Sequence, residues 1–173
     1  METKRLISFS NIYSSHKKPV YHYVLKMVRS SMTAEDIVQN VFMKLFEKMA
    51  TVKNFESIRF WLLKTARNEV YSHFRKLKNR KEETLEENEE TLLSSNLYNE
   101  IEEKEINEIV RNEIGLLPVE LREIFVLREY SGLSYDEISQ LVGVSKDLVK
   151  SRLFSIRQKL IKNVSKKIGV EKK

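Results

Sequence analysis

Basic, amide and aromatic side chains alternate along one face of a helix expected over residues 58–78 and just beyond it. The row consists of Lys64, Arg67, Asn68, Tyr71, Arg75, Lys76, Lys78 and Arg80. Such a row suits a nucleic-acid strand, because cations meet phosphates, an aromatic ring stacks on a base and an amide reads a base edge. An ordinary solvated helix face, with a tyrosine lying along it, accounts for the same pattern.

A second pattern, over residues 134–157, has the layout of a helix-turn-helix. Ser134 and Glu137 form the capping box S-x-x-E at the start of a short helix. Gly143 supplies the left-handed residue of the turn, and Ser145 can cap the next helix. The outward face of that helix carries residue types that contact base edges and phosphates in a major groove: Lys146, Asp147, Lys150, Ser151, Arg152, Phe154 and Arg157. A three-helix module that packs on protein is the alternative.

No pattern in the chain points to catalysis or to a metal. His16, His22 and His73 stand in unrelated contexts, without H-x-x-x-H or E-x-x-H spacing. There is no cysteine, no glycine-rich phosphate loop and no G-x-S-x-G. The carboxylates cluster between residues 81 and 105, where nothing would bury them and shift their pKa values. The sequence therefore predicts a protein that is not an enzyme and has no cofactor.

Glycine and proline are too scarce for a β-rich fold. The chain of 173 residues contains four glycines, all after residue 114, and two prolines. Strands would need turn residues that the first two thirds of the chain lack, so we predict an all-α fold.

The longest apolar runs are four residues, too short to cross a bilayer. The N-terminus lacks the apolar core of a signal peptide. A cytoplasmic protein without membrane insertion is expected.

Charge divides the chain into three blocks. Residues 1–81 carry a net charge of +11, residues 82–115 of −10 and residues 116–173 of +5. Two basic blocks that flank an acidic one suggest a polyanion partner. We predict two small helical domains, residues 10–80 and 106–165, joined by an acidic flexible linker over residues 81–105.

Helical periodicity places the elements of both domains. In the first, helices are expected over residues 20–30, from an N-cap at Thr33 to about residue 49, and over 58–78. The helix after Thr33 should bury Ile37, Val38, Val41, Phe42, Leu45, Phe46 and Met49. Its other face shows Asp36, Gln39, Asn40, Met43 and Glu47. In the second domain, the apolar positions are Ile106, Ile109, Val110, Ile114 and Leu117, then Val149, Leu153, Ile156 and Leu160.

Three stretches together resemble extracytoplasmic-function (ECF) sigma factors, the small two-domain class of bacterial RNA polymerase sigma subunits. AEDIVQNVFMKLF (34–46) resembles the helix of that family that binds core polymerase. FWLLKTARN (60–68), with Arg75 following, resembles its −10 reading helix. LP (117–118) through EIFVLR (123–128), GLSYDEI (132–138) and VKSRL (149–153) resemble its −35 reading domain.

The resemblance implies a role for each surface. The row Asp36, Gln39, Asn40 and Met43 would contact the clamp helices of the polymerase β′ subunit. The −10 DNA would meet a base-receiving loop and the helix after it: Lys53, Asn54, Phe55, Lys64, Arg67, Asn68, Tyr71 and Arg75. The outward residues of the last helix, from Lys146 to Arg157, would read the −35 duplex. The second domain would also lie on the β flap, the acidic linker would follow the RNA exit path, and an anti-sigma factor would be a further partner.

Five positions depart from the family pattern. Ser72 stands where Asp is usual, Ser155 where Arg is frequent, and Asp147-Leu148 where Gly-Thr is usual, which should alter promoter sequence rather than the class of function. Asn40 replaces a common acid in the polymerase contact. A stand-alone helix-turn-helix regulator would explain residues 116–163 but not 34–46, and a structure-specific nucleic-acid enzyme lacks a catalytic constellation.

Overall fold

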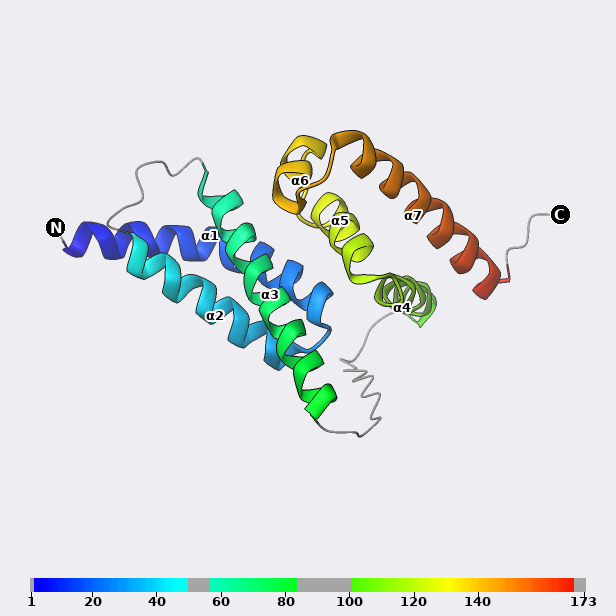
Figure 1. Ribbon diagram of the computed structural model, residues 1–173, viewed down its shortest axis with the longest axis horizontal. Helices are drawn as coiled ribbons and strands as arrows, with labels where there is room; N and C mark the ends of the chain where they lie inside the picture. Colours follow the sequence, from blue (N-terminus) through cyan, green and yellow to red (C-terminus); the bar gives the residue numbers. More distant parts are fainter. Residues whose placement is uncertain (1, 50–56, 84–100, 170–173) are drawn as a thin grey trace. The chain divides into compact units, whose positions relative to one another are not determined.

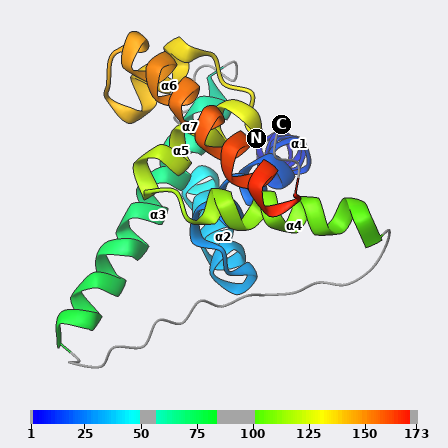
Figure 2. The ribbon, with the colours of Figure 1, turned by 90° about the vertical axis from the view of Figure 1, so that its right-hand side faces the viewer.

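The computed structural model describes residues 2–49, 57–83 and 101–169. Every regular element in these ranges is an α-helix, which confirms the all-α prediction. The chain divides into two compact units, residues 1–94 and residues 95–173. Figures 1 and 2 show the helices of both units, coloured along the chain from blue to red.

The first unit is a bundle of three helices. They are α1 (Glu2–Val28), α2 (Ser31–Lys48) and α3 (Ile58–Glu83), and each packs against the other two. Their shared core contains Val20, Tyr23, Val24, Met27, Ala34, Ile37, Val38, Val41, Phe42, Leu45, Leu62, Leu63, Ala66 and Val70. The apolar stripe predicted for α2 is thus largely confirmed. Phe46 is the exception, because it is 39% exposed.

The first helix is much longer than predicted. It begins at Glu2 rather than near residue 20, and Pro19 lies inside it. A proline inside a helix costs about 3 kcal/mol relative to alanine. Ring contacts between α1 and α2 offset part of this cost: Phe9 meets Phe46 at 5.2 Å between centroids, and Tyr13 meets Phe42 at 4.9 Å.

The cap of α2 is Ser30, and the prediction of Thr33 was wrong. The Ser30 hydroxyl accepts a hydrogen bond from the backbone N–H of Thr33 at 3.3 Å. Thr33 is therefore already in the first turn. Arg29, directly before Ser30, has a φ of +62°, in the left-handed region. This conformation lets the chain reverse between α1 and α2.

Helices extend into both ends of the range predicted as linker. Helix α3 continues to Glu83, and α4 begins at Ile101, so residues 81–83 and 101–105 are helical. The rest of that range, residues 84–100, lies outside the described residues, as does most of the polar break predicted over 51–57.

The second unit contains α4 (Ile101–Gly115), α5 (Val119–Glu129), α6 (Tyr135–Val142) and α7 (Lys146–Lys167). Helix α7 packs against the other three. The four positions predicted to face inward from α7 are all buried: Val149, Leu153, Ile156 and Leu160. In α4, Ile114 is buried as predicted, but Ile106 is 44% exposed.

A buried carboxylate joins α4 to α7. Glu113 is 4% exposed, and its carboxylate oxygens lie 2.8 Å from Lys167 Nζ and 2.7 Å from Asn163 Nδ2, both of which donate to it. These two hydrogen bonds, opposed by burial, lower the pKa of Glu113. A carboxyl group with a lowered pKa in the folded state stabilises the fold above its unfolded pKa and loses this contribution as the pH falls.

We therefore expect Glu113→Gln to lower the free energy of unfolding by about 1–3 kcal/mol at pH 7. The difference from the wild type should shrink as the pH falls below about 4.5, the ordinary value for glutamate. Urea unfolding at pH 7 and pH 3 measures both effects. Glu108→Gln, an exposed position of the same helix, is the control. A loss of stability that is the same at both pH values would contradict this role for the charge.

Candidate polymerase and nucleic-acid interfaces

An exposed polar row runs along α2 on the side away from its core. Asp36, Gln39, Asn40 and Met43 are all exposed, as predicted, and Met43 is 61% exposed. Their spacing of three and four residues places them in one strip of the helix surface. The row is thus open to a partner and takes no part in holding the bundle together.

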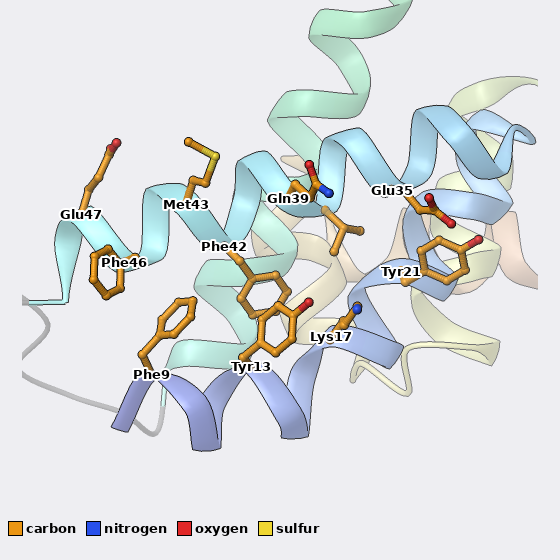
Figure 3. Close-up of a pocket in the computed structure, with 11 residues that line it drawn as sticks. Phe9, Tyr13, Lys17, Tyr21, Glu35, Gln39, Phe42, Met43, Phe46 and Glu47 are labelled. Atoms are coloured by element: carbon orange, nitrogen blue, oxygen red, sulfur yellow. The ribbon is translucent and has the colours of Figure 1, made fainter. Parts of the chain in front are cut away.

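An apolar groove of about 820 Å³ borders this row, between α1 and α2 (Figure 3). Phe9 and Tyr13 rise from α1 toward Phe42 and Phe46 of α2. Gln39 and Met43 belong both to the groove and to the row. Phe46 also lines the groove, which explains why it is not in the core. The side of the groove formed by α1 was not predicted, although Phe9 and Tyr13, two aromatic residues four positions apart, indicated an apolar helix face.

The outer face of α3 presents the side chains predicted to contact DNA. Lys64, Asn68 and Arg75 are exposed, whereas Arg67 and Tyr71 are half-buried. The Arg67 guanidinium lies over the Tyr71 ring, 4.6 Å from its centroid. Such a cation–π contact holds the guanidinium and the ring together on the outer face of α3. The predicted loop residues Lys53, Asn54 and Phe55 lie outside the described residues.

A small hollow of about 290 Å³ lies between α2 and α3. It is lined by Lys44, Lys48, Trp61, Lys64, Thr65, Asn68 and Glu69. Lys48 lies 6.0 Å from the centroid of the Trp61 ring, and Lys44 forms an ion pair with Glu69. Ammonium groups around an indole and an amide suit a phosphate and a base. Sequence reasoning found Lys64 and Asn68 but missed Lys44, Lys48 and Trp61, because they come from two helices.

The three histidines of the chain share a lowered pKa. Burial above all, and neighbouring cations next, lower the pKa of His16, His22 and His73 from the ordinary value of histidine. Within the described ranges, no group of three or more histidine, cysteine or acidic side chains could hold a metal ion.

The helix-turn-helix predicted for the second unit is confirmed. The Glu137 N–H donates to Ser134 Oγ at 3.2 Å, and the Ser134 N–H donates to Glu137 Oε2 at 2.7 Å, which completes the capping box. Gly143 has a φ of +75°, as the turn requires. The Ser145 hydroxyl accepts from the Leu148 N–H at 3.3 Å and so caps α7. Ser139 Oγ donates to the Val144 carbonyl at 2.6 Å across the turn.

The outward face of α7 is arranged largely as predicted. Lys146, Asp147, Lys150, Ser151 and Phe154 are exposed, and Phe154 is 65% exposed although it is aromatic. Arg152 and Arg157 are half-buried. The guanidinium of Arg157 is engaged by Glu129 of α5, at 2.5 Å from Nη2. A phosphate contact by Arg157 must therefore compete with a carboxylate of the same unit.

The described part of the chain contains no helix with both the length and the apolar character needed to cross a bilayer.

Comparison with known proteins identifies both units. The sequence model of Sigma-70 region 2 matches residues 12–80, and that of Sigma-70 region 4 matches residues 107–160. The ECF sigma factor SigM of Bacillus subtilis is 29% identical over 158 residues, which cover 89% of this chain and 93% of SigM. The ECF sigma-E factor of Escherichia coli is 30% identical over 132 residues, 71% of this chain and 69% of that protein.

The fold agrees with these sequence matches. The sigma factor RpoE of Bartonella quintana, solved in complex with the anti-sigma factor NepR, superposes with a TM-score of 0.76 at 20% identity, covering 95% of this chain and 99% of that one. The two sigma-70 regions, each on its own helical unit, account for most of the described chain. The chain belongs to the sigma-70 family of RNA polymerase sigma factors, in the extracytoplasmic-function group.

Proposed function

We propose that this sigma factor binds core RNA polymerase through the exposed row of α2 and reads two promoter elements, one with each unit. The observation that carries this proposal is the pairing, in one chain, of a helix whose polar row takes no part in the core with a capped helix-turn-helix whose second helix is basic. The protein itself catalyses nothing, since it directs and opens promoters through non-covalent contacts.

The first unit would hold the polymerase and the opened −10 strand. Asp36, Gln39, Asn40 and Met43 would contact the clamp helices of the β′ subunit. The lysines of the hollow between α2 and α3 would neutralise phosphates, and Asn68 would read a base edge. Lys53, Asn54 and Phe55, which lie outside the described residues, would receive a flipped base. The support for this assignment is the exposure of Lys64 and Asn68 beside the hollow.

The second unit would read the −35 duplex with α7. Lys150 can donate to guanine, Ser151 can bond to either kind of base edge, and Phe154 can meet a thymine methyl. This unit would also lie on the β flap. An anti-sigma factor is a further proposed partner, since a sigma factor with the same fold was solved with one. A protein that acts with these partners would work in the cytoplasm.

Transcription with purified core polymerase tests the proposal. Core alone and core with this protein are incubated with fragmented genomic DNA, and the 5′ ends of the transcripts are sequenced. We expect a small set of new start sites that share two sequence elements. A stand-alone regulator would bind duplex DNA and yield no new start sites, and that result would overturn the proposal.

A further inference from the structure

Carboxylates of the second unit form ion pairs with most of the cations that we assign to DNA on α7. Asp136 Oδ2 lies 2.7 Å from Lys146 Nζ, and Glu129 Oε1 lies 2.5 Å from Arg157 Nη2. Lys150 makes a longer contact of 3.7 Å with Asp147. Lys146, Lys150, Arg152 and Arg157 are the four cations assigned to the −35 DNA. Among the residues that the structure describes, three of these four face a carboxylate.

The two shorter pairs join different helices. Asp136 lies in the first turn of α6, so its pair with Lys146 bridges the two helices of the helix-turn-helix. Glu129 ends α5 and accepts from both Nε and Nη2 of Arg157, which raises the pKa of that guanidinium. All four side chains remain between 37% and 63% exposed. The pairs therefore lie at the surface, where DNA can replace the carboxylates.

The fold of this unit does not depend on these pairs. Helices α6 and α7 are capped by Ser134 and Ser145, and they pack against each other and bury Ile138, Val149 and Leu153. Surface ion pairs add little to such a core. A carboxylate beside each cation has a direct effect on binding, however, because an approaching phosphate must displace it or be repelled by it.

We propose that Asp136 and Glu129 act as internal competitors of DNA phosphates, and so determine how selectively α7 binds DNA. Non-specific binding draws its free energy from phosphates, whereas specific binding adds base contacts. Competition at Lys146 and Arg157 keeps the free unit off DNA that offers phosphates alone. Base contacts by Lys150, Ser151 and Phe154 then supply the affinity. This inference rests on the proposed reading of duplex DNA by α7.

The test measures binding of the full chain to a random-sequence duplex by fluorescence anisotropy over a range of salt concentrations. Asp136→Asn and Glu129→Gln should each raise affinity about three- to sixfold at low salt. Each freed cation that neutralises one phosphate should steepen the slope of log K against log salt by about 0.9. The double variant should show both changes. Asp136→Glu keeps the charge and should behave as the wild type, which separates the charge from any effect of the side chain on α6.

Glu108→Gln, on α4, is the matched control for a lost exposed carboxylate, and it should leave the slope unchanged. With core polymerase present, competitor DNA should inhibit promoter transcription at lower concentration for the double variant than for the wild type. Wild-type affinity and slope in the double variant, with duplex binding intact, would overturn this inference alone. Failure of every form to bind duplex DNA at low salt would overturn the proposed reading by α7 as well.

Discussion

Asn68→Ala and Lys150→Ala should both reduce transcription from a fully paired promoter, but a pre-melted template should rescue only the first to a large extent. Asn68 is exposed on α3 beside the cation-lined hollow and would act on a strand that is already unpaired. Extruding a base costs a few kcal/mol, which a pocket on the protein must offset. A bubble removes that cost in advance.

Lys150 belongs to a different step. It is exposed on α7 and would donate to a base in intact duplex, so Lys150→Ala should cost about 1–3 kcal/mol at the base pair it reads and relax the preference there. Opening the −10 region in advance does not restore that contact. Permanganate footprinting and transcription on matched duplex and bubble templates measure both variants. Equal rescue of the two, or of neither, would contradict this division between the units.

Replacing Asp36 and Gln39 together with arginine should weaken binding to core polymerase at least tenfold, which corresponds to about 1.4 kcal/mol. Both side chains are exposed and lie off the buried stripe of α2, so the helical content should not change. The effect arises because charges of the wrong sign at an interface cost more than a lost contact. Affinity measured by pull-down, with circular dichroism as the check on folding, reports both quantities.

A matched control comes from the same unit. Ser14 and Ser15 are exposed on α1, outside the α2 row, and changing both to arginine also adds two cations. This control should bind core polymerase nearly as the wild type does. Normal core affinity in the Asp36→Arg, Gln39→Arg variant would remove the row from the polymerase interface.

The sequence predicted the second unit well because its signals are local. The capping box of Ser134 and Glu137, the positive φ of Gly143 and the Ser145 cap each depend on residues a few positions apart. The apolar period of α7 then placed four buried residues correctly. The ion pair of Arg157 with Glu129 joins positions 28 residues apart. No spacing rule predicts such a contact, because it depends on how α5 packs against α7.

The first unit was harder to predict because tertiary contacts override local signals there. Apolar periodicity predicted a first helix over residues 20–30 only, yet packing of Phe9 and Tyr13 on α2 supports a helix from Glu2. Thr33 and Ser30 are both good caps, and the left-handed Arg29 decides in favour of Ser30. The hollow that includes Lys44 and Trp61 exists only because α2 and α3 lie side by side.

The turn between α6 and α7 also bears on how the second unit folds. Its caps join residues three positions apart, and the Ser139 hydroxyl reaches a carbonyl only five positions away. Closing such short loops costs little chain entropy, and folding rates rise as contacts become more local. We expect this turn to form early, as part of the folding nucleus. The long-range contact of Glu113 with Asn163, 50 residues apart, should form only after the transition state.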